Sequence, residues 1–262
     1  MRIQNNITAQ NSHRQYNINN GNIGKNVEKL SSGYRVNRAA DDAAGLAISE
    51  KMRTQIRGLN MASRNSQDGI SLVQTAEGAL QSAHSMLQRM RELAVQSANG
   101  TNTSLDRNAL NLEFEHLRLE LTQIEDRIKF NDLSIFGMNF TLQTGANQGD
   151  ITTFTVLSMR VPSADIKDME SASEAITIIS DYINSLSTTR ATLGAIQNRL
   201  EFKIQNLDNS AENLAAAESR IRDTDMAKMM TEFTKNNILF QASTAMLAQA
   251  NALPQGVLQL LG

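Results

Sequence analysis

Residues 176–221 read ITIISDYINSLSTTRATLGAIQNRLEFKIQNLDNSAENLAAAESRI. Steps of alternately three and four residues along this stretch define a repeat. Its members are Ile176, Ile179, Ile183, Leu186, Arg190, Leu193, Gln197, Leu200, Ile204, Leu207, Ala211, Leu214, Glu218 and Ile221. Only Arg190, Gln197 and Glu218 in this repeat are not apolar. Such spacing keeps one seam of a helix facing a partner helix. The stretch therefore predicts a single helix of roughly 70 Å, at 1.5 Å per residue, that packs along its length.

Two earlier stretches carry the same repeat. The members of the first are Val73, Ala76, Leu80, Ala83, Leu87, Met90 and Ala94. The members of the second are Leu110, Phe114, Leu117, Leu121, Ile124 and Ile128. One helix cannot bury so narrow a stripe alone, so the three should pack side by side. We expect an all-α fold, an elongated antiparallel helical bundle or coiled coil, with helices over about 43–98, 104–130 and from about 170.

A different composition interrupts the helical pattern at residues 140–157. Phenylalanine, leucine, isoleucine and valine alternate there with threonine on both sides of the segment GANQG at 145–149. Apolar runs that flank a glycine-bounded turn are typical of a β-hairpin. We therefore expect one small β-hairpin in an otherwise helical chain.

The two ends of the chain carry apolar residues without a partner nearby in sequence. A last helix is expected over about 226–253, where Pro254 should kink or end it. The tail beyond is apolar through Leu253, Val257, Leu258, Leu260 and Leu261. The simplest arrangement pairs the two ends with each other, and the remaining apolar surface then contacts other subunits.

Composition excludes several classes of function. The 262 residues include no Cys and carry a formal net charge of −2, with basic and acidic residues interleaved. This argues against disulfide scaffolds, thiolate chemistry and a nucleic-acid partner, and no apolar run approaches the roughly 20 residues that span a membrane. His13, His84 and His116 have no second ligand at helical spacing. We expect no enzymatic activity, no metal and no cofactor.

Several motifs resemble, in the family's order, the terminal blocks and the hairpin loop of bacterial flagellin. They are KLSSGYRVN at 29–37, AADDAAGLAI at 39–48, RMRELAVQ at 89–96, GANQG at 145–149, RIRDTDMA at 220–227 and LAQAN at 247–251. The resemblance implies a subunit that polymerises into the flagellar filament for swimming. A hook–filament junction protein, which shares both terminal blocks, is the alternative.

The resemblance also implies a division of labour along the chain. Residues 1–42 and 222–262 correspond to the two halves of an inner coiled coil that lines the filament core. Residues 43–221 correspond to an outer helical bundle with the hairpin near 140–157. Only residues 158–169 separate the hairpin from the next helix, so the chain resembles a minimal flagellin without variable outer domains.

The partners implied are further copies of the chain, a flagellar secretion chaperone, the filament cap and the hook-junction proteins. The location implied is the extracellular flagellum, after export through the flagellar type III secretion apparatus. Residues 1–22 are rich in Asn and Gln and lack the apolar core of a secretory signal peptide, so we expect no cleaved signal.

One further partner implied by the resemblance is the flagellin-sensing Toll-like receptor, through the positions Arg89, Leu93 and Glu113. The repeat places Arg89 beside the seam and Leu93 at its edge, where we expect an exposed apolar anchor. Glu113 lies close by if the two helices pack antiparallel. A mixed patch of this kind suits recognition, and we expect assembly and recognition to use the same surface.

Overall fold

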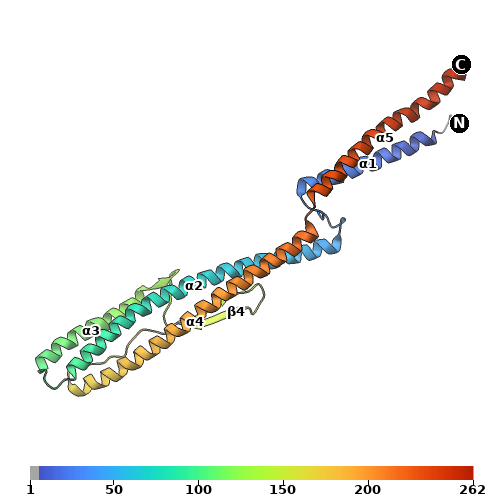
Figure 1. Cartoon of the computed structure of the whole chain (residues 1–262). Coiled ribbons are helices and arrows are strands. Elements are labelled where there is room, and N and C mark those ends of the chain that lie inside the picture. Colours follow the sequence, from blue (N-terminus) through green and yellow to red (C-terminus); the bar gives the residue numbers. More distant parts are fainter. Residues whose placement is uncertain (1–5, 262) are drawn as a thin grey trace. The chain divides into compact units, whose positions relative to one another are not determined.

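The computed structural model describes the backbone of residues 6–261 and the side chains of residues 6–252. Its elements follow in the order α1 (Ile7–Ser32), α2 (Ala43–Ser97), α3 (Ser104–Arg127), β1 (Lys129–Phe130), β2 (Leu133–Ser134), β3 (Asn139–Gln143), β4 (Ile151–Thr155), α4 (Met169–Arg222) and α5 (Met226–Leu261), as Figure 1 shows. The chain forms two compact units. The terminal unit comprises Met1–Thr54 and Asn213–Gly262, and the central unit comprises Gln55–Glu212.

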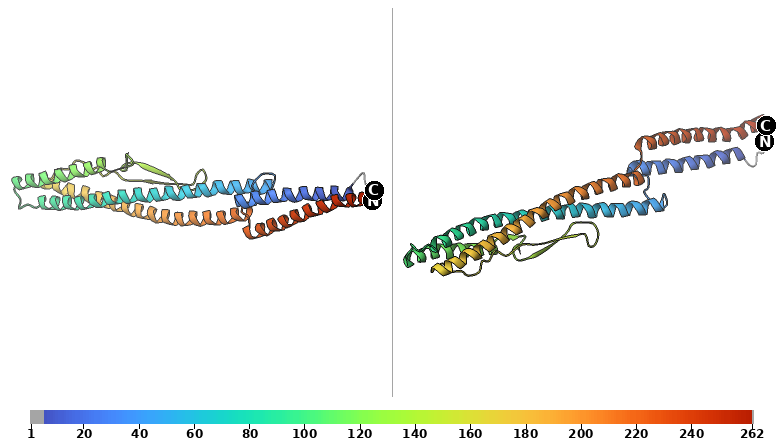
Figure 2. Two further views of the ribbon diagram at one scale, coloured as in Figure 1. Left: turned by 90° about the horizontal axis from the view of Figure 1, so that it is seen from above. Right: turned by 60° about the horizontal axis from the view of Figure 1, so that its bottom comes forward.

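The central unit is a bundle of α2, α3 and α4, which lie side by side in both views of Figure 2. Its pairs Ser63–Asp208 (3.0 Å) and Glu77–Arg190 (3.6 Å) show that α2 and α4 run antiparallel. The predicted bundle is confirmed. On α4 the most deeply buried stripe residues are seven apart, as a helix seam requires: Ile179, Leu186, Leu193, Leu200 and Leu207.

The predicted hairpin is formed by β3 and β4, which pair antiparallel from Asn139↔Thr155 to Gln143↔Ile151. Phe140 and Phe154 stack on its inner face with ring centroids 5.7 Å apart. A second, two-residue pair of strands, β1 and β2, was not predicted. It is closed by Asn131 and Asp132, which have φ angles of 50° and 62°, as a type I′ turn requires.

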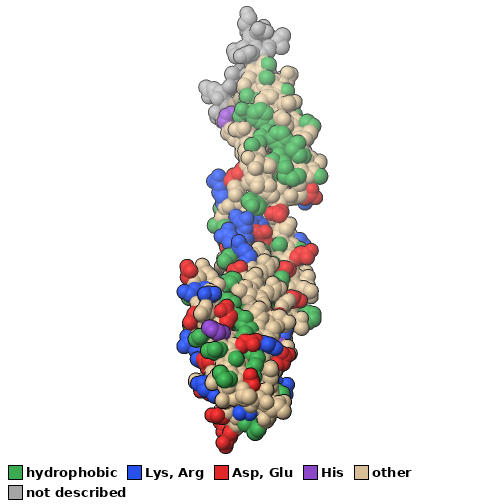
Figure 3. All heavy atoms as spheres, turned by 90° about the vertical axis from the view of Figure 1, so that its left-hand side faces the viewer, with side chains coloured by type: hydrophobic (Ala, Val, Ile, Leu, Met, Phe, Trp, Pro, Cys, Tyr) green, Lys and Arg blue, Asp and Glu red, His purple; other side chains and the backbone are tan. Residues whose placement is uncertain are grey.

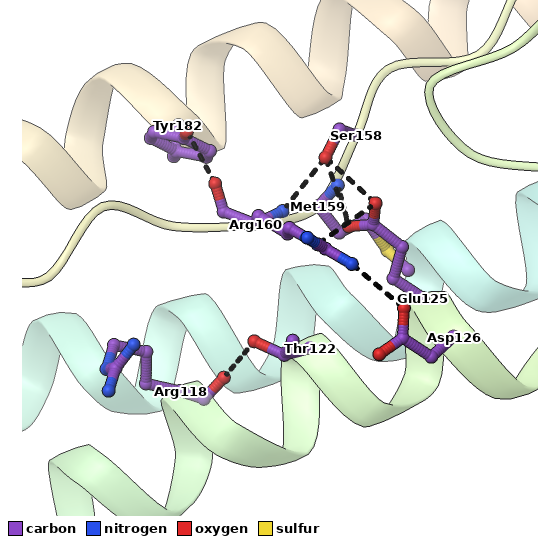
Figure 4. A network of polar contacts seen from close by, with 8 residues as sticks. All are labelled: Arg118, Thr122, Glu125, Asp126, Ser158, Met159, Arg160 and Tyr182. Carbon is purple, nitrogen blue, oxygen red and sulfur yellow. Dashed lines mark hydrogen bonds and ion pairs between the residues drawn. The ribbon is translucent and has the colours of Figure 1, made fainter.

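The loop between β4 and α4 is fixed to α3 by a buried carboxylate, Glu125 (Figure 4). Ser158 Oγ donates to both of its oxygens, at 3.0 and 3.1 Å, and the backbone N–H of Met159 donates at 2.9 Å. On the rim of this network Arg160 Nη2 donates to Asp126 at 3.0 Å. These bonds hold the loop between β4 and α4 against α3.

The terminal unit contains α1 and α5 as an antiparallel pair. Asn6 near the start of α1 is bonded to Ala250 near the end of α5, and Asn19 further along α1 is bonded to Ser243. The Tyr16 ring packs against Phe240, with centroids 4.8 Å apart. The two ends of the chain therefore pair, as the sequence predicts.

The segments that lead out of α1 and into α5 are tied together within the terminal unit. The guanidinium groups of Arg222 and Arg53 lie over the Tyr34 ring, at 4.8 and 5.7 Å from its centroid. The N–H of Thr224 donates to Gly33 O at 3.0 Å, and the N–H of Arg35 donates to Arg222 O at 2.7 Å. Cation–π contacts and a short antiparallel bridge thus join the two connecting segments.

Helix α5 continues beyond Pro254 to Leu261, so the expectation that the helix stops at about residue 253 is wrong. Of the two effects expected of Pro254, a kink or an end, the structure rules out the end. Proline has no N–H and leaves the carbonyl four residues earlier, that of Ala250, without its helical donor. The side-chain amide of Asn6 donates to this oxygen at 2.7 Å. The missing helical bond is therefore replaced from α1, which lowers the cost of proline inside the helix.

Candidate functional site

Arg89 joins α2 to α3 on the surface of the central unit. Its Nε donates to Glu113 Oε1 at 2.9 Å, and its Nη1 donates to Glu92 Oε2 at 3.1 Å. Hydrogen bonds to Glu113 first, and to Glu92 second, raise the pKa of Arg89 above its usual value. The guanidinium is half exposed and is preorganised by two carboxylates on one side. The structure thus brings two of the three predicted contact residues together.

Leu93 occupies a different place from the one expected. Its side chain is 0% exposed and belongs to the core of the central unit. The prediction that it forms an exposed apolar anchor is therefore wrong. The reason is that α2 packs against two helices and buries a wider arc than a single seam, so that Met90, Leu93 and Ala94 are all inside.

Val95 is one of the exposed apolar residues of this region, with 53% of its surface exposed. It lines an open groove of about 480 Å³ together with Gln88, Arg91, Glu92 and Gln96. Glu92 also binds Arg89, so the groove is continuous with the Arg89–Glu113 pair. The signal that could have identified Val95 is its position outside the buried repeat, one residue beyond the seam residue Ala94.

The α1–α5 pair of the terminal unit leaves many apolar side chains exposed. Figure 3 shows hydrophobic side chains gathered on the visible face of this pair. Its exposed members include Ile7, Ile18, Val27, Met226, Met230, Ile238, Leu239 and Met246. A soluble monomer rarely exposes so many apolar side chains on one pair of helices, so this surface is a candidate for contact between subunits.

The predicted polymerisation residues lie in the tail whose side chains are outside the described residues. They are Leu253, Val257, Leu258, Leu260 and Leu261. The backbone there continues α5 to Leu261. The tail is thus a helical extension of the same α5 that carries the exposed methionines.

Metal binding and membrane insertion can be judged for residues 6–252, the part of the chain whose side chains the structure describes. No group of three or more His, Asp or Glu side chains in this part of the chain is placed to hold a metal ion. Among the helices of that same part, none combines the length and the hydropathy needed to cross a membrane.

These observations define a helical-bundle protein with paired terminal helices and a small β-hairpin. Comparison with known proteins gives the family. The model for the bacterial flagellin N-terminal helical region matches residues 3–141, and that for the C-terminal helical region matches residues 176–261. Together they cover most of the chain, which belongs to the bacterial flagellin family.

Individual relatives agree with this assignment over their whole length. The chain is 56% identical to a flagellin of Halalkalibacterium halodurans and 48% identical to a flagellin of Bacillus subtilis, in both cases over 100% of each chain. The crystal structure of Bacillus cereus flagellin is 33% identical, with a TM-score of 0.51 over 59% of this chain and 94% of that one. A structure assigned to a Vibrio parahaemolyticus hook-associated protein, with a TM-score of 0.59 and 11% identity, covers 70% of this chain and shares the fold.

Proposed function

We propose that this chain is a structural subunit that polymerises into the bacterial flagellar filament. The observation that carries the proposal is the full-length identity of 56% and 48% to two flagellins. The exposed apolar surface of the α1–α5 pair supports it, because polymerisation buries such a surface against neighbouring copies. Adaptable methionines at Met226, Met230 and Met246 suit packing in slightly different surroundings along a polymer.

The two units take different roles in this proposal. The α1–α5 pair forms the inner coiled coil of the filament core, and the central bundle with its hairpin forms the outer layer. The two compact units divide after Thr54, inside α2, and before Asn213, inside α4. The sequence instead predicts boundaries at about residues 42 and 222. With either pair of boundaries, the connecting segments at Tyr34 and Asp223 belong to the proposed inner part.

The apolar tail at 253–262 contributes to polymerisation. Burial of each of its five large apolar side chains is worth about 1.5–3 kcal/mol. The tail extends the helix that carries the exposed methionines, so the same neighbouring copies can cover both.

The Arg89–Glu113 pair is the centre of the contact surface that we assign to the flagellin-sensing Toll-like receptor. A half-exposed guanidinium held by Glu113 and Glu92 retains donors for a partner without losing further freedom on binding. Leu93 supports this surface from the core, and Val95 supplies the exposed apolar contact. The same surface is covered by a neighbouring copy in the filament, so intact filaments do not present it.

The remaining partners follow from the proposed filament role. They are a flagellar secretion chaperone, the filament cap and the hook-junction proteins. Export proceeds through the flagellar type III secretion apparatus, to an extracellular location in the flagellum. The family is a structural one, and we infer that the chain has no catalytic function.

Expression in a motile bacterium that lacks its own flagellin tests the filament role against the hook–filament junction alternative. A filament subunit restores long filaments and swimming. A junction protein leaves bare hooks and non-motile cells even when the chain is exported. The second result in cells that secrete the chain would overturn the proposal.

A further inference from the structure

A polar pocket of about 340 Å³ lies between α1 and α5 in the terminal unit. Helix α1 contributes Asn22, Lys25, Asn26 and Lys29, and α5 contributes Glu232, Lys235 and Asn236. The spacings of three, four and seven residues place each set on one face of its helix. The two faces meet, because α1 and α5 form an antiparallel pair.

The pocket carries an excess of positive charge. Its three lysines and one glutamate give a local net charge of +2. Within residues 6–252, whose side chains are described, none of Lys25, Lys29 and Lys235 forms an ion pair. Three ammonium groups that form no direct ion pair in this part of the chain therefore border one small space, which also holds the Glu232 carboxylate.

A buried amide at the pocket also lacks a partner. Asn26 is only 8% exposed, and no described atom accepts a hydrogen bond from its Nδ2. Asn19, one heptad earlier in the same seam, is equally buried but donates to Ser243 Oγ at 2.9 Å. A buried donor without an acceptor is unfavourable. The difference between these two asparagines indicates that the environment of Asn26 is completed by an acceptor from outside.

We propose that this pocket binds a small tetrahedral oxyanion, of which phosphate and sulfate are the simplest examples. Ammonium groups and amide N–H groups are all donors, and charge-assisted bonds from lysine to phosphate are strong. Among the residues whose side chains are described, no aromatic side chain lines the pocket to stack on a base, so the ligand class is the anion itself rather than a nucleotide. Because the lysines come from both helices, the bound anion fastens α1 to α5.

Hydrogen exchange of the full-length monomer, read by mass spectrometry, tests this site. Exchange in α1 and α5 is compared between sodium phosphate and sodium chloride at equal ionic strength. At a phosphate concentration about ten times the Kd of the site, exchange in segments 22–29 and 232–236 should slow roughly ten-fold. The reason is that the anion binds only when α1 and α5 are paired. Exchange in the central bundle should not change. Equal slowing in both units would show general salting-out and overturn the proposal.

Charge-matched variants distinguish this site from a general ionic effect. The double variant Lys25→Gln and Lys235→Gln removes two donors and should abolish the phosphate effect. The control Lys51→Gln and Lys228→Gln removes the same charge from the terminal unit outside the pocket and should retain it. Asn26→Leu should weaken the phosphate effect while keeping α1 and α5 paired. An equal response of the two double variants would contradict the proposal.

A carboxylate from another copy of the chain offers the same chemistry as phosphate. A protein-concentration series without phosphate separates the two sources. We expect exchange in segments 22–29 and 232–236 to be independent of concentration below the onset of assembly. Slowing with protein concentration that Lys25→Gln and Lys235→Gln abolishes would assign the pocket to a neighbouring subunit and overturn a free-anion site.

Discussion

Asn6 and Ala250 are hydrogen-bonded across 244 residues of sequence, with 2.7 Å between Asn6 Nδ2 and the carbonyl oxygen of Ala250. The same asparagine caps α1, because its Oδ1 accepts from the N–H of Ala9 at 3.1 Å. Pro254 makes the first bond necessary, since it cannot donate to Ala250. One side chain thus begins α1 and completes α5.

Replacing Asn6 should loosen the outer end of the α1–α5 pair. In Asn6→Ala, the loss of an N-cap costs about 0.5–2 kcal/mol, and the loss of the bond to Ala250 adds to it. Hydrogen exchange in the first turns of α1 should accelerate. Asn20→Ala, at an exposed position of the same helix, should leave exchange unchanged or slower. Equal protection in the wild type and in Asn6→Ala would contradict this assignment.

Leu93 and Val95 should respond oppositely to truncation. Leu93→Ala removes a fully buried core side chain, so the free energy of unfolding, measured with urea, should fall by about 2–5 kcal/mol. Val95→Ala removes an exposed side chain and should change the unfolding free energy by no more than about 0.5 kcal/mol. If Leu93→Ala unfolds like the wild type, its place in the core is wrong.

Arg89 should matter for receptor binding without supporting the fold. We expect Arg89→Ala to weaken binding of the monomer to the flagellin-sensing Toll-like receptor by more than about 1 kcal/mol. Its helical content by circular dichroism should not change, because the side chain is half exposed. Arg64→Ala, an exposed arginine of the same helix, serves as the control. Equal receptor binding by cross-linked filaments and monomers would show that this surface is not covered on assembly.

The start of α3 should be sensitive to acid. A hydrogen bond from the Thr103 hydroxyl, followed by one from its backbone N–H, lowers the pKa of Asp106. A carboxyl group whose pKa is lower in the folded state stabilises that state at pH values above its unfolded pKa. This contribution to stability is lost as the pH falls through the folded pKa. An NMR titration should find the Asp106 pKa below its usual value of about 3.9, and Thr103→Val should raise it. An unchanged pKa in Thr103→Val would contradict the capping role.

The sequence predicts the fold well where burial follows a simple period. Every member of the α2 repeat from Val73 to Ala94 is buried, because this stripe packs against the other helices of the bundle. Leu93 was misplaced because α2 has two neighbouring helices, and the buried arc is then wider than a two-helix seam. The strands β1 and β2 were missed because their turn depends on two residues, Asn131 and Asp132, rather than on an apolar pattern.

The pairing of distant polar groups was beyond the sequence for a different reason. The resemblance to flagellin predicts that Arg89 and Glu113 lie close together, and they form a hydrogen bond. Lys25 and Lys235 meet at one pocket only because α1 pairs with α5. Likewise, Pro254 alone predicts a kink or an end of the helix. Only the side chain of Asn6 explains why the helix continues.

Seeded elongation is the most direct measurement of the central claim that this chain polymerises through its paired ends. Purified monomer is added to short fragments of its own filaments, and filament length is followed by electron microscopy. The full chain should elongate the fragments, whereas a chain without residues 253–262 should remain monomeric and keep the circular dichroism of the central bundle. Failure of the full chain to elongate its own fragments, or normal elongation by the truncated chain, would contradict the account.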